Sequence, residues 1–150
     1  MIRQITGEEL GRYVLASYPE AVEQWHGYDL WVNPNSILEV SRFLKDSPQM
    51  GFNLLSAISA VDYFDYFEIV YHVTSTTNLH TAIVKAKVWG RDEPSLPSVV
   101  SVWQGADFQE REIWDLMGVR FEEHPNLKRI LLWEGYPGHP LRKDYLELPR

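Results

Sequence analysis

The last quarter of the chain constrains the fold more than any other part of the sequence. Residues 106–117 carry apolar side chains at helical spacing, and Gly118 follows them, where glycine enters the left-handed conformation without steric cost. Asp107 is the expected N-cap of this helix, and Glu110 completes a capping box with it. From Gly118 to Tyr145 the sequence predicts a strand and then a loop-rich tail without a regular apolar period. Because a chain that must close its own core seldom ends in this way, we expect the tail to serve another purpose.

Charged residues are dense on this helix. Arg111 and Asp115 are four residues apart and can pair along one face, while two glutamates project on either side of that pair. Carboxylates that share a face raise each other's pKa and attract cations, so one candidate is a metal or acid–base site made of Glu110, Glu112, Asp115 and His124. The alternative is a solvated or partner-facing charged surface, of the kind that helical ion pairs commonly form.

The composition suits a single domain. The chain has 150 residues, of which 45% are hydrophobic, and we divide it into an α+β body over residues 1–105 and a helix with an extended partner-binding tail over residues 106–150. The absence of cysteine excludes disulfides, thiol catalysis and cysteine-ligated iron–sulfur clusters within this polypeptide. A formal net charge of −7 disfavours general binding to nucleic acid or to an anionic membrane. With no apolar run near the roughly 20 residues that cross a bilayer, we expect a soluble chain that stays where it is made.

Two further helices are predicted in the body. Each follows a capping box, namely Thr6 with Glu9 and Ser36 with Glu39. Apolar residues recur at helical spacing after both boxes, which predicts helices over about residues 7–17 and 37–46.

The body also contains four runs with the composition of β-strands. A partly alternating run over residues 21–32 predicts the first strand, and runs rich in β-branched and aromatic residues predict three more, over residues 52–62, 66–75 and 79–89. Short connections make these three antiparallel neighbours. The predicted fold is α+β, with two helices packed on a mostly antiparallel sheet of about four strands, followed by a third helix and an extended C-terminal tail.

One face of the last of these strands is basic. Lys85 and Lys87 share that face, opposite alternating apolar residues. A solvated strand face is the favoured interpretation, and contact with a partner is the alternative.

No common catalytic motif is present. The sequence lacks a G-x-S-x-G elbow, a Gly-rich phosphate loop and a G-x-G-x-x-G fingerprint. His26, His72 and His80 are isolated in strand-like runs, where a hydrogen-bonded histidine is the expected state. His124 and His139 each precede a proline, but their spacing builds no metal site by itself. A fold that brings distant residues together could still form a free-standing metal-dependent enzyme, which would use Glu112, Asp115, His124 and His139.

The tail is better explained as a contact with another protein. Residues 135–141 alternate flexible glycines with stiff residues, so that no helix or strand persists there. This region displays Trp133, Tyr136 and Leu141 with no periodic place in a core. Aromatic anchors beside arginine are typical of interfaces. The alternative is a tail that folds back and covers the domain's own sheet.

The same residues resemble the signature of a known family. The matching groups, at nearly fixed spacing, are Glu110-Arg111-Glu112, Asp115-Leu116-Met117-Gly118-Val119, Phe121, His124-Pro125, Leu127, Arg129-Ile130-Leu131 and Gly138-His139-Pro140-Leu141-Arg142-Lys143-Asp144-Tyr145. In this block the chain is similar to the 30 kDa subunit, also called the C subunit, of respiratory complex I, the proton-pumping NADH:quinone oxidoreductase.

The resemblance implies a non-catalytic structural and assembly subunit of the peripheral arm of that enzyme. Such a subunit lies on the cytoplasmic side of the bacterial inner membrane and reaches the membrane only through the complex. It braces the large subunit related to nickel–iron hydrogenases, near the quinone site, and contacts iron–sulfur subunits. The chain itself holds no cofactor or metal, while FMN and iron–sulfur clusters belong to its partners. Similar chains serve ferredoxin-dependent quinone reductases and membrane hydrogenases, which form the alternative.

The resemblance also implies which residues bind the partner. The tail acts as a strap, the helix braces it, and the residues concerned are Glu110, Arg111, Glu112, Asp115, His124, Arg129, His139, Arg142, Lys143, Asp144 and Tyr145. Because the sequence ends soon after Tyr145, we expect the chain to lack the long C-terminal extension of some relatives.

Overall fold

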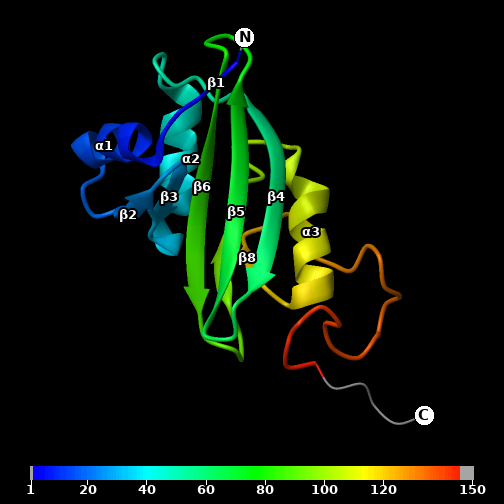
Figure 1. Ribbon diagram of the computed structural model, residues 1–150. Coiled ribbons are helices and arrows are strands. Elements are labelled where there is room, and N and C mark those ends of the chain that lie inside the picture. The colour runs from blue at the N-terminus through cyan, green and yellow to red at the C-terminus, as the bar shows by residue number, and fades with distance from the viewer. Residues whose placement is uncertain (1, 146–150) are drawn as a thin grey trace.

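A six-stranded sheet stands at the centre of the computed structural model, which describes residues 2–145 (Figure 1). Its strands are β1 (Arg3–Gln4), β2 (Val22–His26), β3 (Asp29–Val32), β4 (Leu54–Asp62), β5 (Tyr66–Ser75) and β6 (His80–Trp89). The order across the sheet is β2-β3-β6-β5-β4, and β1 pairs with β6. The pairs β2–β3, β4–β5 and β5–β6 are antiparallel, whereas β1 and β3 run parallel to β6. The predicted α+β class with a mostly antiparallel sheet is therefore confirmed.

Three helices flank this sheet. They are α1 (Gly7–Ser17), α2 (Ile37–Asp46), which follows the 3-10 turn η1 (Pro34–Ser36), and α3 (Ala106–Met117). Two short strands, β7 (Ser95–Pro97) and β8 (Arg120–Glu122), form a separate parallel pair. Figure 1 shows α2 behind the sheet and α3 along β4, while the face of β4, β5 and β6 turned to the viewer carries no helix. Within residues 2–145, no helix is long and apolar enough to cross a membrane.

The burial of β6 explains this layering. Ala82, Val84 and Ala86 are buried on one face of the strand, while Ile83, Lys85 and Lys87 on the other face are only half-buried. This alternation is what a strand with one covered face requires. The buried face joins apolar residues of α1 and α2 in a single core.

The sheet has two more strands than expected, because β1 has no counterpart among the predicted strands and one predicted strand is wrong. Residues 21–32 form the hairpin of β2 and β3 and not a single strand. Gly27 lies in the turn with a φ of 59°, a conformation that glycine adopts without strain. His26 pairs with Asp29 across that turn. The alternating pattern continues on both sides of Gly27, and for that reason it favours one continuous strand in the sequence.

The predicted helix caps are confirmed in part. The side chain of Thr6 accepts a hydrogen bond from the backbone N–H of Glu9 at 3.1 Å, as the first capping box requires. Ser36 makes no such bond, because the chain enters α2 through η1, which is capped instead by Asn33. Asp107 is also not an N-cap, because α3 begins at Ala106 and its N-cap position is Gly105, two residues before Asp107.

Candidate partner-binding site

The tail after β8 is organised around the carboxylate of Asp115, on the last turns of α3. This side chain is fully buried, and its Oδ2 accepts hydrogen bonds from the backbone N–H groups of Ile130, Leu131 and Leu132 at 3.1, 2.7 and 2.9 Å. Its Oδ1 lies 2.8 Å from a guanidinium nitrogen of Arg129. Burial alone raises the pKa of the Asp115 carboxyl, but these donors outweigh burial and lower that pKa below its usual value.

Arg129 links two parts of the tail to α3. Its guanidinium also donates to the carbonyl oxygen of Asp115 at 2.9 Å and to those of Tyr136 and Gly138, both at 2.7 Å. Arg111 donates to the carbonyl oxygens of Lys128 and Arg129, each at 3.2 Å. The predicted helical pair of Arg111 with Asp115 is therefore wrong, because Asp115 pairs with Arg129 and Arg111 donates to backbone carbonyls of the tail.

His139 packs the tail against the end of α3. Its Nδ1 lies 2.9 Å from the carbonyl oxygen of Asp115, so the proton of the neutral ring sits on Nδ1. The ring covers Gly118 and contacts Trp114, with ring centroids 4.8 Å apart. Burial lowers the pKa of His139, and although the bond to Asp115 opposes this, the nearby charge of Arg129 lowers that pKa further.

A second attachment fixes the end of the tail to the sheet. Asp62, at the end of β4, is buried and accepts hydrogen bonds from two guanidinium nitrogens of Arg91 and from the backbone N–H of Lys143 at 2.9 Å. Arg142 donates to the carbonyl oxygen of Arg91, and both arginines pair with Asp144. Hydrogen bonding to Arg91 holds the pKa of Asp62 far below its usual value, and bonding to Arg142 lowers that of Asp144 to about 2. Sequence reasoning missed Asp62 and Arg91, because no local spacing connects them with the tail.

Glu110 lies inside the protein and not on the charged surface. Its carboxylate accepts hydrogen bonds from the Ser98 hydroxyl at 2.5 Å and from the backbone N–H of Val99 at 2.9 Å. It thereby supports the turn that leads into α3. Burial raises the pKa of Glu110 to about 7, against the effect of these two hydrogen bonds. Glu112, by contrast, is exposed.

The structure does not assemble the ligands of the metal-dependent enzyme considered above. The buried ring of His124 accepts at Nδ1 from the backbone N–H of Asn126, so Nε2 carries the proton and points to the carbonyl oxygen of Asp107. His139 faces a backbone oxygen at the other end of α3. In the described part of the chain, no three histidine, aspartate or glutamate side chains are grouped to hold a metal ion.

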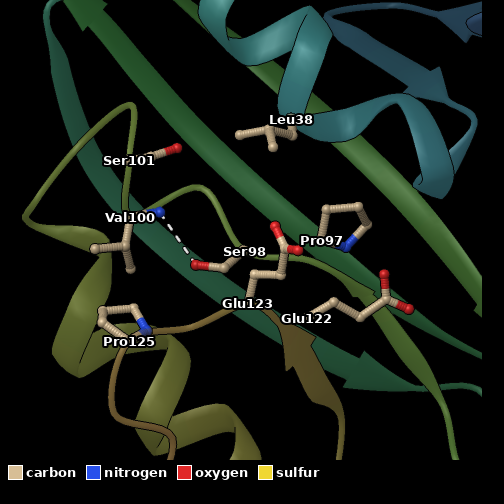
Figure 2. Close-up of a pocket in the computed structure, with 8 residues that line it drawn as sticks. All are labelled: Leu38, Pro97, Ser98, Val100, Ser101, Glu122, Glu123 and Pro125. Carbon is tan, nitrogen blue, oxygen red and sulfur yellow. Dashed lines mark hydrogen bonds between the residues drawn. The ribbon is translucent and has the colours of Figure 1, made fainter.

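A cavity of about 630 Å³ opens between α2 and the segments around β7 and β8 (Figure 2). Its lining is mostly apolar, and Figure 2 shows the Glu123 side chain directed into it; the residues are Leu38, Pro97, Ser98, Val100, Ser101, Glu122, Glu123 and Pro125. Ser98 links this lining to the interior, because its hydroxyl donates a hydrogen bond to Glu110. The lining includes two exposed glutamates, Glu122 and Glu123.

The tail displays apolar side chains on this rigid frame. Leu131, Trp133 and Leu141 are 60%, 65% and 59% exposed, although the backbone around them is hydrogen-bonded to α3. Tyr145 contacts the tail itself, with its hydroxyl 3.3 Å from that of Tyr136. The tail is thus folded back onto the protein through its polar groups, while its large apolar groups face outward. Such a patch is typical of a protein–protein contact.

The chain is similar to known proteins of one family. A sequence model of the family described as the respiratory-chain NADH dehydrogenase 30 kDa subunit matches residues 30–148. The chain is 46% identical over 124 residues to the C 2 subunit of the NADH-quinone oxidoreductase of Rhizobium etli, and this match covers 80% of this chain and 65% of that protein. It is 41% identical over 136 residues to the C subunit of the same enzyme of Roseiflexus sp., covering 86% and 78%.

A solved structure is similar as well. It is that of the membrane-bound sulfane sulfur reductase, an archaeal respiratory membrane complex. One of its chains superimposes with a TM-score of 0.74 at 27% sequence identity, over 95% of this chain and 86% of that one.

Proposed function

Because the chain belongs to the family of the 30 kDa subunit of respiratory-chain NADH dehydrogenase, we propose that it is a structural subunit of an NADH:quinone oxidoreductase. Its membership confirms the resemblance that the signature residues indicate. The chain spans 65% of the length of the Rhizobium etli protein that it matches. That it works within a complex with NADH:quinone oxidoreductase activity is therefore proposed.

The role proposed for the chain is to brace the hydrogenase-like large subunit beside the quinone site. One observation carries this proposal: the tail is held rigidly by Asp115 and Asp62, yet it turns Leu131, Trp133 and Leu141 outward. A pre-ordered segment loses little conformational entropy when it binds. Exposed Trp and Leu side chains on such a segment supply the apolar anchors of an interface.

In this proposal the redox chemistry belongs to the partner subunits, which hold FMN and the iron–sulfur clusters. The chain lies in the peripheral arm, on the cytoplasmic side of the bacterial inner membrane. The predicted partner-binding residues differ in role: Asp115, Arg129 and His139 shape the tail, and exposed side chains such as Glu112 meet the partner. Glu110 and His124 are buried and support the structure around α3. The lack of cysteine supports a subunit without a cluster of its own.

The double substitution Leu131→Ser with Trp133→Ser tests this proposal. The Trp133 ring contacts that of Tyr136, with centroids 5.5 Å apart, but both substituted side chains are mostly exposed and the hydrogen bonds that hold the tail are made by Asp115 and Asp62. The purified chain is therefore expected to keep its melting temperature. In a strain in which the variant replaces the native chain, we expect the amount of large subunit that co-purifies to fall about tenfold or more, as the loss of interface anchors implies. Tyr28→Ser, which removes an exposed aromatic side chain from the β2–β3 turn, is the matched control. Normal assembly and normal quinone reductase activity in the double variant contradict the proposal.

A second candidate is a subunit of a related membrane complex with another electron donor or acceptor. The similarity to a chain of the archaeal sulfane sulfur reductase supports this candidate. Ferredoxin-dependent quinone reductases and membrane hydrogenases are complexes of this kind. Membranes from the native strain separate the two candidates. NADH:quinone reductase activity that disappears when the chain is deleted supports the first, and loss of a ferredoxin-dependent activity alone supports the second.

A further inference from the structure

Strand β4 forms one edge of the central sheet, with β5 on one side of it and no strand on the other (Figure 1). The turn after β4 shows which of its residues bond to β5, because the N–H of Tyr63 donates to the carbonyl oxygen of Tyr66 at 2.9 Å. Along antiparallel strands, hydrogen-bonded pairs alternate with pairs that are not bonded. Counting back from Tyr63 through the regular register, Ala60 and Ile69 form a pair that is not bonded, so the N–H and C=O of Ala60 point away from β5.

The chain covers this edge on both sides of Ala60. Two residues earlier, the outward N–H of Ile58 donates to Oε1 of Gln109 on α3 at 2.7 Å. Two residues later, the carboxylate of Asp62 accepts from the backbone N–H of Lys143 in the tail. In the part of the chain that the structure describes, the N–H and C=O of Ala60 have no hydrogen-bond partner. Ala60 is therefore an opening in the edge between two covered positions, and unpaired edge groups are where another chain can pair with a sheet.

Ala60 also lines a groove between β4 and α3. The groove has a volume of about 190 Å³, and Ile113, Leu116 and Met117 of α3 form its apolar wall. Leu141 of the tail lines it as well. Pockets for small molecules usually begin at roughly 300 Å³, so this groove has room for a side chain and a short piece of main chain rather than for a cofactor.

The charge around the groove limits what can enter it. Among the described residues that line it, only Glu112 is charged, and its side chain is exposed. The neighbouring Arg111 is turned away, because its guanidinium donates to the carbonyl oxygens of Lys128 and Arg129. A segment that enters the groove is therefore expected to carry an apolar side chain flanked by neutral or basic residues.

The groove continues into the apolar patch that the tail displays. Leu141 lines the groove and is also one of the outward side chains of the tail, together with Leu131 and Trp133. A partner bound to the tail therefore lies next to the groove. A second copy of this chain fits less well, because the open stretch of edge between Gln109 and the tail is too short for two β4 strands to pair along it.

We propose that an extended segment of the protein that binds the tail docks in this groove. Its main chain pairs with the N–H and C=O of Ala60, and one of its apolar side chains packs against Ile113 and Leu116. The proposal rests on the proposed function, because it assigns the groove and the tail to the same partner. The two parts of the contact differ in role: main-chain hydrogen bonds add affinity for any extended segment, while the apolar wall selects among side chains.

The substitution Ala60→Pro tests the main-chain contact. Proline has no N–H, and it is tolerated on an edge strand where that N–H makes no bond within the sheet. Ala60→Gly is the matched control, because glycine also weakens a strand but keeps the N–H. We expect the two purified variants to have similar melting temperatures. In a strain that carries each tagged variant, we expect about tenfold less co-purified large subunit with Ala60→Pro than with Ala60→Gly.

Amide exchange tests the same contact without a substitution. In the purified native chain, the N–H of Ala60 should exchange near its intrinsic rate, whereas that of Ile58 is slowed by its bond to Gln109. In the assembled complex, we expect exchange at Ala60 to slow about tenfold or more. Mass spectrometry with fragmentation that resolves single residues compares the two states, and it decides the outcome if Ala60→Pro does not fold.

Failure of this proposal can be told from failure of the proposed function. If Leu131→Ser with Trp133→Ser blocks assembly while Ala60→Pro assembles as well as Ala60→Gly, the tail binds the partner but the groove does not, and the proposed function stands. If none of these variants affects assembly, both fail together. Equally fast exchange at Ala60 in the free chain and in the complex overturns the main-chain contact. If the purified chain dimerises and Ala60→Pro abolishes the dimer without affecting assembly, the groove receives a second copy and not the partner.

Discussion

At the scale of single residues, burial separates carboxylates that look alike in the sequence. Glu110 and Asp115 are both fully buried, but Asp115 faces a guanidinium and three backbone N–H groups, whereas Glu110 receives only a hydroxyl and one N–H. The pKa of Asp115 is therefore lowered and that of Glu110 is raised to about 7. The two groups respond to pH in opposite directions.

The raised pKa of Glu110 predicts that ionisation of this residue destabilises the fold. A carboxyl with a folded-state pKa of about 7 and an ordinary value of 4.5 gives its full stability below about pH 4.5 and loses it as pH rises through 7. The loss amounts to about 3 kcal/mol. We expect Glu110→Gln to abolish this dependence. The unfolding free energy of the variant minus that of the native chain should therefore be about 3 kcal/mol larger at pH 8 than at pH 4.5.

Urea unfolding at both pH values measures this difference. Glu112→Gln, on the exposed face of the same helix, is the control. An equal pH dependence in the native chain and in Glu110→Gln contradicts the assignment.

At the scale of elements, the C-terminal end of α3 both caps the helix and contacts the tail of the same chain. Gly118 has a φ of 76°, which confirms the predicted left-handed cap, and its N–H donates to the carbonyl oxygen of Trp114. A Cβ at this position would lie 2.7 Å from Cδ2 of His139. Glycine is thus required twice, for the end of the helix and for the approach of the tail.

Gly118→Ala is therefore expected to cost more than the backbone strain alone. We expect a loss of about 2 kcal/mol or more in unfolding free energy, because the new methyl group also displaces His139. Gly27→Ala is the matched control, since Gly27 has a similar φ of 59° but a methyl group there would meet no atom within 4 Å, and it should lose only about 1 kcal/mol. Chemical denaturation of both variants provides the comparison, and equal losses would mean that the contact with His139 is unimportant.

At the scale of the whole molecule, acid acts on the tail and on the body in opposite directions. The pKa values of Asp62, Asp115 and His139 are all lowered in the folded protein, so the stability they contribute is present above their ordinary values, 3.8 for the aspartates and 6.5 for the histidine, and is lost as pH falls. These three residues attach the tail. Glu110, buried on α3 away from the tail, has a raised pKa, so its contribution to stability increases as pH falls through 7 toward 4.5.

We therefore expect acid to release the tail before it unfolds the sheet. As pH falls from 7 through 3.8 toward 2, amide protection should be lost first at Ile130, Leu131 and Leu132, whose N–H groups bind Asp115, and only later within β5 and β6. Amide exchange followed by NMR, corrected for intrinsic exchange rates, measures both. Loss of protection in the tail and in the sheet at the same pH would show that they unfold as one unit.

Much of the fold could be predicted because it depends on local spacing. The cap at Thr6, the end of α3 at Gly118 and the strands over residues 66–75 and 80–89 all follow from residues close in sequence. The family could be identified in the same way, because its signature is a block of consecutive residues. The hairpin of β2 and β3 could not, because the pattern on both sides of Gly27 keeps the same alternation.

The sequence by itself determined the helices, most strands, the absence of cysteine chemistry and the family, because each depends on residue type and short-range order. Only the tertiary structure decided which charges meet. Asp115 pairs with Arg129 and not with Arg111, Asp62 holds both Arg91 and the backbone of Lys143, and Glu110 turns inward to Ser98. These partners are distant in sequence, and their choice depends on which groups are buried together, where an unpaired charge is most costly.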